Sequence, residues 1–337
     1  DKKLTIIVGK NGVGKSNILE AVALLAGTRS AKVETDLDLV FFGRDSAKVE
    51  GSVNVEGERG ELVCNLQVVD GRVGKSYFIN SSKKRFTDFS EEFAIVVFAP
   101  VDMDLVSGSP SLRRRHLDVR LSSVDRDYGR SILAYGKLVT RRNKVLQRIW
   151  EGKSKPLELS FWDERLSEYG KYISKKREEF FEYLNFVNAT AGDWQNSGPV
   201  TRISQFGDLS WELKQSTISI EKLLKNRERD IAAGITLSGP HRDDFRFRFR
   251  GRDLEFFGSR GEQRMAVLAL KLAELEYYKM KKGYRPILAL DDIFSELDWE
   301  HRDTVLFVIG NQQTIITAAE EESIPKEIFK KAKVIRL

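Results

Sequence analysis

The sequence predicts an α/β protein in which the first and last thirds of the chain form one lobe and a helical insertion forms another. An apolar, β-branched run at residues 4–8 is followed by a glycine-rich turn and a helix-like segment at 17–26. Glycine and proline become sparse between about residues 111 and 188, and strand-like alternation returns after Thr236. We therefore expect one lobe of residues 1–110 and 236–337, and an arm lobe of residues 111–235.

Length and composition restrict the class of protein. The 337 residues are 41% hydrophobic, which is enough for a sizeable core. There are 56 Lys and Arg residues against 50 Asp and Glu residues, so charge favours a polyanionic partner only mildly. The single cysteine, Cys64, excludes an internal disulfide, and no apolar run approaches the roughly 20 residues that span a bilayer. We therefore expect a cytoplasmic protein with no membrane partner.

Further elements follow from local patterns. Residues 33–99 contain short alternating segments between glycine and charged turns, which predict a β-rich subregion of antiparallel strands. Its segments include SVNVEG, ELVCNLQVVDG and AIVVFAP. Downstream, DFRFRFRG predicts an amphipathic strand, residues 262–282 predict a long amphipathic helix, and PILALDD predicts a buried strand.

The glycine-rich turn after residue 8 matches the P-loop pattern G-x-x-x-x-G-K-[ST], and it has the required strand before it and helix after it. Its residues are Gly9, Lys10, Asn11, Gly12, Val13, Gly14, Lys15 and Ser16. The glycines allow backbone NH groups to surround phosphates. Lys15 would neutralise the β- and γ-phosphates of ATP, and the Ser16 hydroxyl would ligate Mg²⁺. The sequence therefore predicts an ATP and Mg²⁺ site.

A P-loop fold also needs a carboxylate at the end of a buried strand to hold the Mg²⁺ shell. Asp291 and Asp292 follow the apolar run at 287–290 and supply it. Asp291 is the candidate metal ligand. Asp292 is placed to polarise the attacking water as general base, so Asp292 and Lys15 are the candidate catalytic residues.

The predicted helix at 262–282 is opened by an S-x-G-x-Q pentapeptide that looks like the signature motif of ABC-type ATPases. Its candidate nucleotide-binding residues are Ser259, Arg260, Gly261 and Gln263. A serine hydroxyl and exposed helix NH groups suit a γ-phosphate. In ABC-type proteins these groups cap the nucleotide of a second subunit. Asp298, in the segment SELD, resembles the D-loop of the same proteins.

With these motifs in hand, most of the chain resembles the RecF family of bacterial DNA-repair ATPases, which are relatives of the SMC heads. The segments SPSLRRRHLD, GPHRDD, SRGEQRMAVLALKLAE and LALDDIFSELD carry the resemblance. It implies an ABC-type ATPase head in which a helical arm replaces the long SMC coiled coil. It also implies an ATP-dependent homodimer on DNA at single-strand gaps or junctions, association with RecR and RecO, and support of RecA loading.

The sequence departs from the pattern of this family in three respects. The chain begins at the P-loop strand, without the strand segment that normally precedes it. The segment 98–102, where a Q-loop glutamine is usual, has none, and Asp102 is the nearest stand-in. Thr317 stands about where the switch histidine is expected. An aspartate base without a switch histidine predicts slow hydrolysis, which we expect DNA to stimulate.

A basic stripe in the arm is the candidate DNA contact. Lys137, Arg141, Lys144 and Arg148 recur at intervals of 4, 3 and 4, which places them on one narrow face of a helix. Such a stripe suits a phosphate backbone, although a solvated surface face explains it equally well. Arg113, Arg114 and Arg115 could pair with acids or contact DNA, and His241 is a candidate for coupling the lobes. No base-reading motif is present, so binding would be independent of sequence.

Three other functions fit parts of the sequence. An ATP-gated DNA scaffold would need no turnover. The ATPase subunit of a membrane transporter would normally carry the Q-loop glutamine and switch histidine, and it would have no use for the arm. Another SMC-like repair ATPase would normally have a much longer coiled coil than residues 111–235 can supply.

Overall fold

The computed structural model describes residues 3–28, 35–55, 57–190, 208–296 and 309–337, and these fall into two compact units. The head unit holds the described residues up to Asp104 and from Ser259 onward. The arm unit holds Leu105–Ala189 and Asp208–Gly258.

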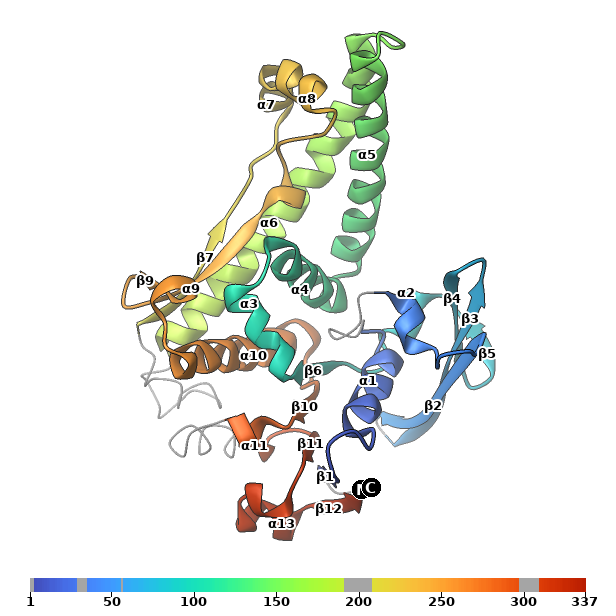
Figure 1. The fold of residues 1–337 in the computed structure, drawn as a ribbon, viewed down its shortest axis with the longest axis vertical. Coiled ribbons are helices and arrows are strands. Elements are labelled where there is room, and N and C mark those ends of the chain that lie inside the picture. Colours follow the sequence, from blue (N-terminus) through green and yellow to red (C-terminus); the bar gives the residue numbers. More distant parts are fainter. Residues whose placement is uncertain (1–2, 29–34, 56, 191–207, 297–308) are drawn as a thin grey trace. The chain divides into compact units, whose positions relative to one another are not determined.

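The head unit is organised around a parallel sheet with strand order β12-β1-β11-β10-β6 (Figure 1). These strands are β1 (Leu4–Val8), β6 (Ile95–Phe98), β10 (Ile287–Asp291), β11 (Thr314–Ala318) and β12 (Lys333–Arg336). The inner strands are mostly Ile, Val, Leu and Ala with a few Thr, as expected for a parallel sheet that is covered on both faces. Because β11 lies between β1 and β10, it connects the two strands that carry the sequence motifs.

Two helices of the head unit bear on the predicted site. Helix α1 (Lys15–Leu25) packs Leu19 and Ala23 against Ile95 and Ala289 of the sheet. Helix α10 (Arg260–Lys282) begins in a capping box and ends at Gly283, which has the left-handed φ of 81° that favours glycine at a helix end. The long helix predicted at 262–282 is therefore confirmed. The shorter helical segments of this unit are η1 (Asp36–Leu39), α2 (Phe86–Phe89), η2 (Pro100–Met103), α11 (Ile293–Glu296), η6 (Glu321–Ser323) and α13 (Lys326–Lys331).

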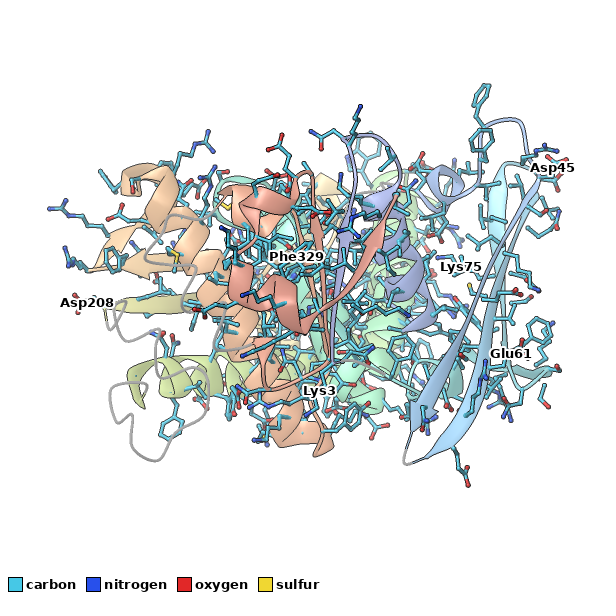
Figure 2. The ribbon with its side chains drawn as sticks, turned by 90° about the horizontal axis from the view of Figure 1, so that it is seen from below. Lys3, Asp45, Glu61, Lys75, Asp208 and Phe329 are labelled. Atoms are coloured by element: carbon cyan, nitrogen blue, oxygen red, sulfur yellow. The ribbon has the colours of Figure 1, made fainter. Side chains whose placement is uncertain are left out.

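The predicted antiparallel β-rich subregion is present. Strands β2 (Ser46–Val55), β3 (Glu58–Val69), β4 (Arg72–Ile79) and β5 (Ser82–Lys84) form a meander in that order. Figure 2 shows Asp45 and Glu61 toward opposite ends of the long β2–β3 hairpin. One face of the sheet buries Leu62, Cys64 and Leu66, and this burial raises the pKa of the Cys64 thiol. The run IVVF was expected in this subregion, but it forms β6 of the parallel sheet, because it is apolar at every position and suits burial on two faces.

The arm unit consists of long helices and a small antiparallel sheet (Figure 1). Its main helices are α4 (Pro110–Val124), α5 (Arg126–Trp150) and α6 (Ser160–Thr190). The shorter ones are α3 (Asp104–Ser107), η3 (Pro156–Leu159), α7 (Ile220–Lys225), α8 (Arg227–Ala233), η5 (Pro240–Arg242) and α9 (Leu254–Phe257). The sheet has the order β7 (Leu209–Lys214), β8 (Asp244–Phe249), β9 (Arg252–Asp253).

The boundaries of the arm unit differ from those expected at 110/111 and 235/236. Residues 236–258 were expected in the first lobe, but β8 pairs with β7 from Leu209↔Phe249 to Lys214↔Asp244, and it therefore belongs to the arm. Arg113 of α4 also holds Asp244 through two hydrogen bonds, of 2.6 and 3.0 Å. Cross-strand pairing joins these distant segments, and no local pattern encodes it.

Among the helices that the structure describes, none is both long enough and apolar enough to cross a membrane.

Candidate nucleotide-binding site

The P-loop connects β1 to α1 in the head unit. Gly12 and Gly14 have φ angles of 88° and 103°, which residues with a side chain rarely adopt. Lys15 is only 7% exposed, and its Nζ donates to the carbonyl oxygens of Gly9, at 2.5 Å, and Lys10, at 3.0 Å. The loop therefore curls around the ammonium group, and it can surround an anion with positive charge and backbone NH groups.

Asp291 ends β10 and lies against the start of α1. Its Oδ1 accepts hydrogen bonds from Ser16 Oγ at 3.0 Å and from Thr317 Oγ1 at 2.7 Å. Hydroxyl and carboxylate oxygens are the hard ligands that Mg²⁺ prefers. Ser16 and Asp291 thus form a donor pair that fits this ion.

Asp292 follows with a φ of 53°, an uncommon backbone conformation for a non-glycine residue. Its backbone NH donates to the carbonyl oxygen of Thr317 at 3.2 Å and to its Oγ1 at 3.0 Å. The buried Thr317 hydroxyl therefore fixes both aspartates. From sequence, Thr317 marked only the place of a missing histidine. The register Asp291↔Thr317 gives it this role, and that register depends on sheet order.

These residues meet around one cavity of about 340 Å³, within the size range of small-ligand sites. Its lining residues are Asn11, Gly12, Gly14, Lys15, Ser16, Asn17, Pro100, Val101, Asp291 and Asp292. Gly9 and Lys10 contribute the carbonyls that hold Lys15, and Val13 is 45% exposed. Residues from opposite ends of the chain are thus brought together as the motifs predict.

The Q-loop expectation needs correction. Pro100 and Val101 line the cavity, but Asp102 does not. Its carboxylate is buried and accepts from Lys271 Nζ on α10 at 2.7 Å and from the backbone NH of Ala99 at 2.8 Å. A buried polar group needs a partner, and Asp102 and Lys271 supply one to each other, so Asp102 is held in the protein interior and is not a stand-in for the Q-loop glutamine.

The signature residues stand at the N-terminus of α10. Ser259 Oγ accepts from the Glu262 backbone NH at 3.2 Å, and the Ser259 NH donates to Glu262 Oε2 at 2.7 Å. This capping box uses the serine as an acceptor and leaves its hydroxyl hydrogen able to donate to a phosphate. Ser259 and Arg260 are exposed, Gly261 is half-buried and Gln263 is buried. The described residues that line the P-loop cavity include none of these four, and Asp298 lies outside the described residues.

In the arm unit, Lys137, Arg141, Lys144 and Arg148 are all exposed on α5, while Tyr135, Leu138 and Leu146 of the same helix are buried. The two-sided helix that the spacing predicts is therefore confirmed.

Arg113 and Arg114 face inward, because Arg113 is held by Asp244 and Arg114 donates to the carbonyl oxygen of Asp243 at 2.9 Å. Phe245 and Phe247 of the predicted amphipathic strand are buried, so their rings are not available to stack on DNA bases.

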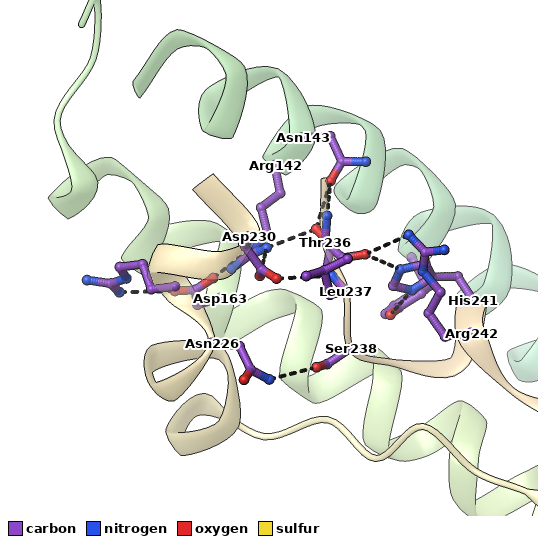
Figure 3. A network of polar contacts seen from close by, with 12 residues as sticks. Arg142, Asn143, Asp163, Asn226, Asp230, Thr236, Leu237, Ser238, His241 and Arg242 are labelled. Carbon is purple, nitrogen blue, oxygen red and sulfur yellow. Dashed lines mark hydrogen bonds and ion pairs between the residues drawn. The ribbon is translucent and has the colours of Figure 1, made fainter. Parts of the chain in front are cut away.

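His241 belongs to a polar network in the arm unit (Figure 3). Its Nε2 lies 3.0 Å from the carbonyl oxygen of Thr236, so Nε2 carries the hydrogen, and Nδ1 accepts from the Tyr135 hydroxyl at 2.9 Å. Burial lowers the pKa of His241 below its ordinary value of 6.5. Among the residues with described side chains, no group of three or more His, Cys, Asp or Glu could hold a metal ion.

Comparison with known proteins identifies the family of this chain. The model of the RecF/RecN/SMC N-terminal domain family matches residues 1–335. The DNA replication and repair protein RecF of Moorella thermoacetica is 38% identical over 331 residues, covering 98% of this chain and 87% of that protein. The protein of the same name from Ligilactobacillus salivarius is 33% identical over 346 positions, covering 99% and 90%.

Two solved structures are described as the recombination mediator protein RecF in the RecFOR pathway, one named with ATPrS and one with ATP. Both match with a TM-score of 0.83 and 28% identity. They cover 100% and 96% of this chain, and 90% and 88% of the matched chains. Together these matches show that the chain belongs to the RecF/RecN/SMC N-terminal domain family and, within it, to the RecF proteins.

Proposed function

We propose that this chain is a DNA-binding ATPase of recombinational repair and replication restart, in which ATP binding closes two copies head to head on DNA and hydrolysis reopens them. The observation that carries the proposal is that Lys15, Ser16, Asp291 and Asp292 meet around one cavity, while Ser259 stands outside it, exposed at a helix N-terminus. The relatives named for DNA replication and repair, and the solved relative named with ATP, support it.

The motif residues at the cavity have separate roles in this proposal. The loop NH groups from Gly9 to Ser16 and the Lys15 ammonium bind the phosphates. Ser16 and Asp291 hold Mg²⁺, which when bound with ATP neutralises charge on the phosphate oxygens. Asp292 accepts a proton from the attacking water as general base.

The signature residues complete the site of the other copy. Ser259, Arg260, Gly261 and Gln263 would cap the nucleotide that the second copy holds, with Asp298 nearby as the D-loop residue. Because Ser259 and Arg260 are exposed in this chain, a two-fold dimer would form two such composite sites. Hydrolysis would then require two copies, so we expect it to be slow and to be stimulated by DNA.

The stripe of Lys137, Arg141, Lys144 and Arg148 supplies a sequence-independent contact to the DNA backbone. The substrates would be single-strand gaps or junctions of single- and double-stranded DNA. The solved relatives belong to a pathway named RecFOR, which supports RecO and RecR as partners, and the role would be to assist RecA loading.

Sedimentation with and without ATP and gapped DNA tests the proposal. We expect the wild-type chain to dimerise only with ATP, and Ser259→Arg to bind ATP but stay monomeric. Ser52→Arg, an equal change at an exposed position of β2, is the control and should dimerise normally. Absence of an ATP-dependent dimer, or normal dimerisation of Ser259→Arg, would contradict the composite site.

Asp292→Asn separates binding from turnover. The variant should bind ATP and accumulate as a dimer, with hydrolysis lower by about 10²- to 10⁴-fold, the usual contribution of a general base. Full support of gap repair by this variant would favour an ATP-gated scaffold that needs no turnover.

A further inference from the structure

Two adjacent phenylalanines stand directly before the signature motif. Phe256 and Phe257 close α9 and are 66% and 71% exposed. Neighbouring aromatic side chains with this much exposure are costly to leave in water. In sequence, Phe257 is two residues before Ser259.

Contacts on both sides of the two phenylalanines fix the turn that carries them, and this turn holds their rings in an exposed position. Asp253 is buried and caps α9, because its Oδ1 accepts from the Glu255 NH at 3.1 Å and its Oδ2 accepts from Arg246 Nη1 at 2.6 Å. Leu254 is buried, and the Gly258 NH donates to its carbonyl oxygen at 3.2 Å. A Cβ at Gly258 would lie 2.8 Å from the backbone carbonyl oxygen of Leu254, so this close return of the chain favours glycine.

The length of chain between Phe257 and Ser259 limits what the rings can reach. Two residues span at most about 7 Å, so Phe257 stays within that distance of Ser259 in any arrangement of the units. If the Ser259 hydroxyl caps a γ-phosphate on another copy, Phe257 comes within side-chain reach of that copy's P-loop. The apolar residue inside that loop is Val13, which is 45% exposed.

We propose that Phe256 and Phe257 form an apolar contact with a second copy of this chain, around Val13 of its P-loop, in the ATP-bound dimer. The contact would occur twice by two-fold symmetry. It would exclude water around each composite site and strengthen the polar contact of Ser259 with phosphate. The inference rests on the proposed function, since it needs the signature and the P-loop to meet between copies.

The chain contains a matched control for this test. Phe41 and Phe42 are also adjacent and exposed, at 80% and 98%, on a turn in which the Arg44 NH donates to the Phe41 carbonyl oxygen. They lie far from the signature in sequence. A Phe256→Ser/Phe257→Ser double variant and a Phe41→Ser/Phe42→Ser double variant therefore make the same two substitutions at two exposed places, and the control removes at least as much exposed apolar surface.

Sedimentation velocity over a range of protein concentrations with ATP measures the dimer dissociation constant. We expect it to rise at least 10-fold for the 256/257 variant and to stay unchanged for the 41/42 variant, with ATP affinity of the monomer unchanged in both. A wild-type dissociation constant for the 256/257 variant overturns the inference. If the 256/257 variant dimerises like the wild type but Ser259→Arg does not dimerise, the proposed function stands and only the inference about the aromatic contact is overturned. If wild-type protein never dimerises, both fall.

A photoreactive benzoylphenylalanine in place of Phe257 locates the contact. Mixed ¹⁴N- and ¹⁵N-labelled copies are irradiated with ATP, and cross-linked peptides are identified by mass. A cross-link between differently labelled copies that joins position 257 to the peptide containing Val13 is expected. Cross-links to nucleotide, to DNA or to another region of the chain would show that the rings face something else.

Discussion

At the scale of single residues, Thr317 is the side chain that contacts both Asp291 and Asp292 of the candidate site. Its hydroxyl donates to Asp291 Oδ1 and accepts from the Asp292 NH, and its carbonyl oxygen accepts from the same NH. The side chain is fully buried. One hydroxyl therefore orients the candidate metal ligand and the candidate base together.

Replacing Thr317 by Val should reduce both stability and hydrolysis. The change removes two hydrogen bonds, one to the Asp291 carboxylate and one from the Asp292 NH, and their loss costs about 1–3 kcal/mol in the free energy of unfolding. Thr314→Val is the control on the same strand, since Thr314 is equally buried but bonds only to the carbonyl oxygens of Ile309 and Gln312. Urea unfolding should show a loss in both variants, whereas ATP hydrolysis should fall only in Thr317→Val. Equal hydrolysis by the two variants would remove the positioning role.

His241 predicts a dependence of stability on pH. Desolvation by burial lowers the pKa of His241 in the folded state below 6.5. As the pH falls through 6.5, the unfolded chain therefore takes up the proton first, and the free energy of unfolding decreases by up to about 1.4 kcal/mol per pH unit. Unfolding by urea between pH 7.5 and 5.5 should show this slope. It should persist in His116→Gln and flatten in His241→Gln; a slope unchanged in His241→Gln would place its origin elsewhere.

At the scale of elements, helix α5 has one face for the interior and another for solvent. Arg142, fully buried, donates at 2.7 Å to Asp163 of α6 and to Asp230 of α8, and at 2.9 Å to Thr236 Oγ1 (Figure 3). Such buried ion pairs are stable only when every charge has a partner. The network thus ties three helices and the following segment into one arm.

Arg142→Met should therefore destabilise the arm by about 3–5 kcal/mol, because it removes the buried cation that pairs with Asp230 and leaves the buried Asp163 to its remaining ion pair with Arg227. Lys144→Met, two residues further on the exposed face, is the matched control and should change stability by less than about 0.5 kcal/mol. Denaturant unfolding followed by far-UV circular dichroism measures both. Lys144→Met should weaken DNA binding without lowering the free energy of unfolding. An Arg142 variant as stable as the wild type would mean that the carboxylates are reached by water.

At the scale of the whole molecule, the chain separates nucleotide chemistry from the basic stripe. The P-loop cavity belongs to the head unit, whereas Lys137, Arg141, Lys144 and Arg148 belong to the arm unit. The formal net charge of +6 is modest, so charge placement and not total charge would direct DNA binding.

Neutralising the stripe should change how DNA binding depends on salt. If all four side chains contact phosphates of double-stranded DNA, changing them together to Gln should reduce the slope of log affinity against log salt by roughly 3–4, since each contact contributes about 0.9. Fluorescence anisotropy with gapped DNA between 50 and 300 mM salt measures this slope. Changing Lys48, Lys83, Lys84 and Arg44, exposed cations of the head unit, provides a charge-matched comparison. If the two sets of substitutions changed the salt dependence equally, the stripe would make no specific contact with DNA.

The sequence by itself determined the elements whose signals are local. The P-loop, the apolar strand before Asp291, the helix opened by Ser259 and the two faces of α5 all depend on neighbours within a few residues, and period and turn chemistry encode them directly. The same holds for the meander of β2 to β5, where hairpin turns connect consecutive strands.

Only the tertiary structure decided which distant segments meet. It placed β11 between the two motif strands, which gave Thr317 its role, and it turned Asp102 toward Lys271 and away from the cavity. It also assigned β8 to the arm through pairing with β7, and it left Phe256 and Phe257 exposed. These outcomes depend on strand order, register and burial, which arise from packing between residues far apart in the chain.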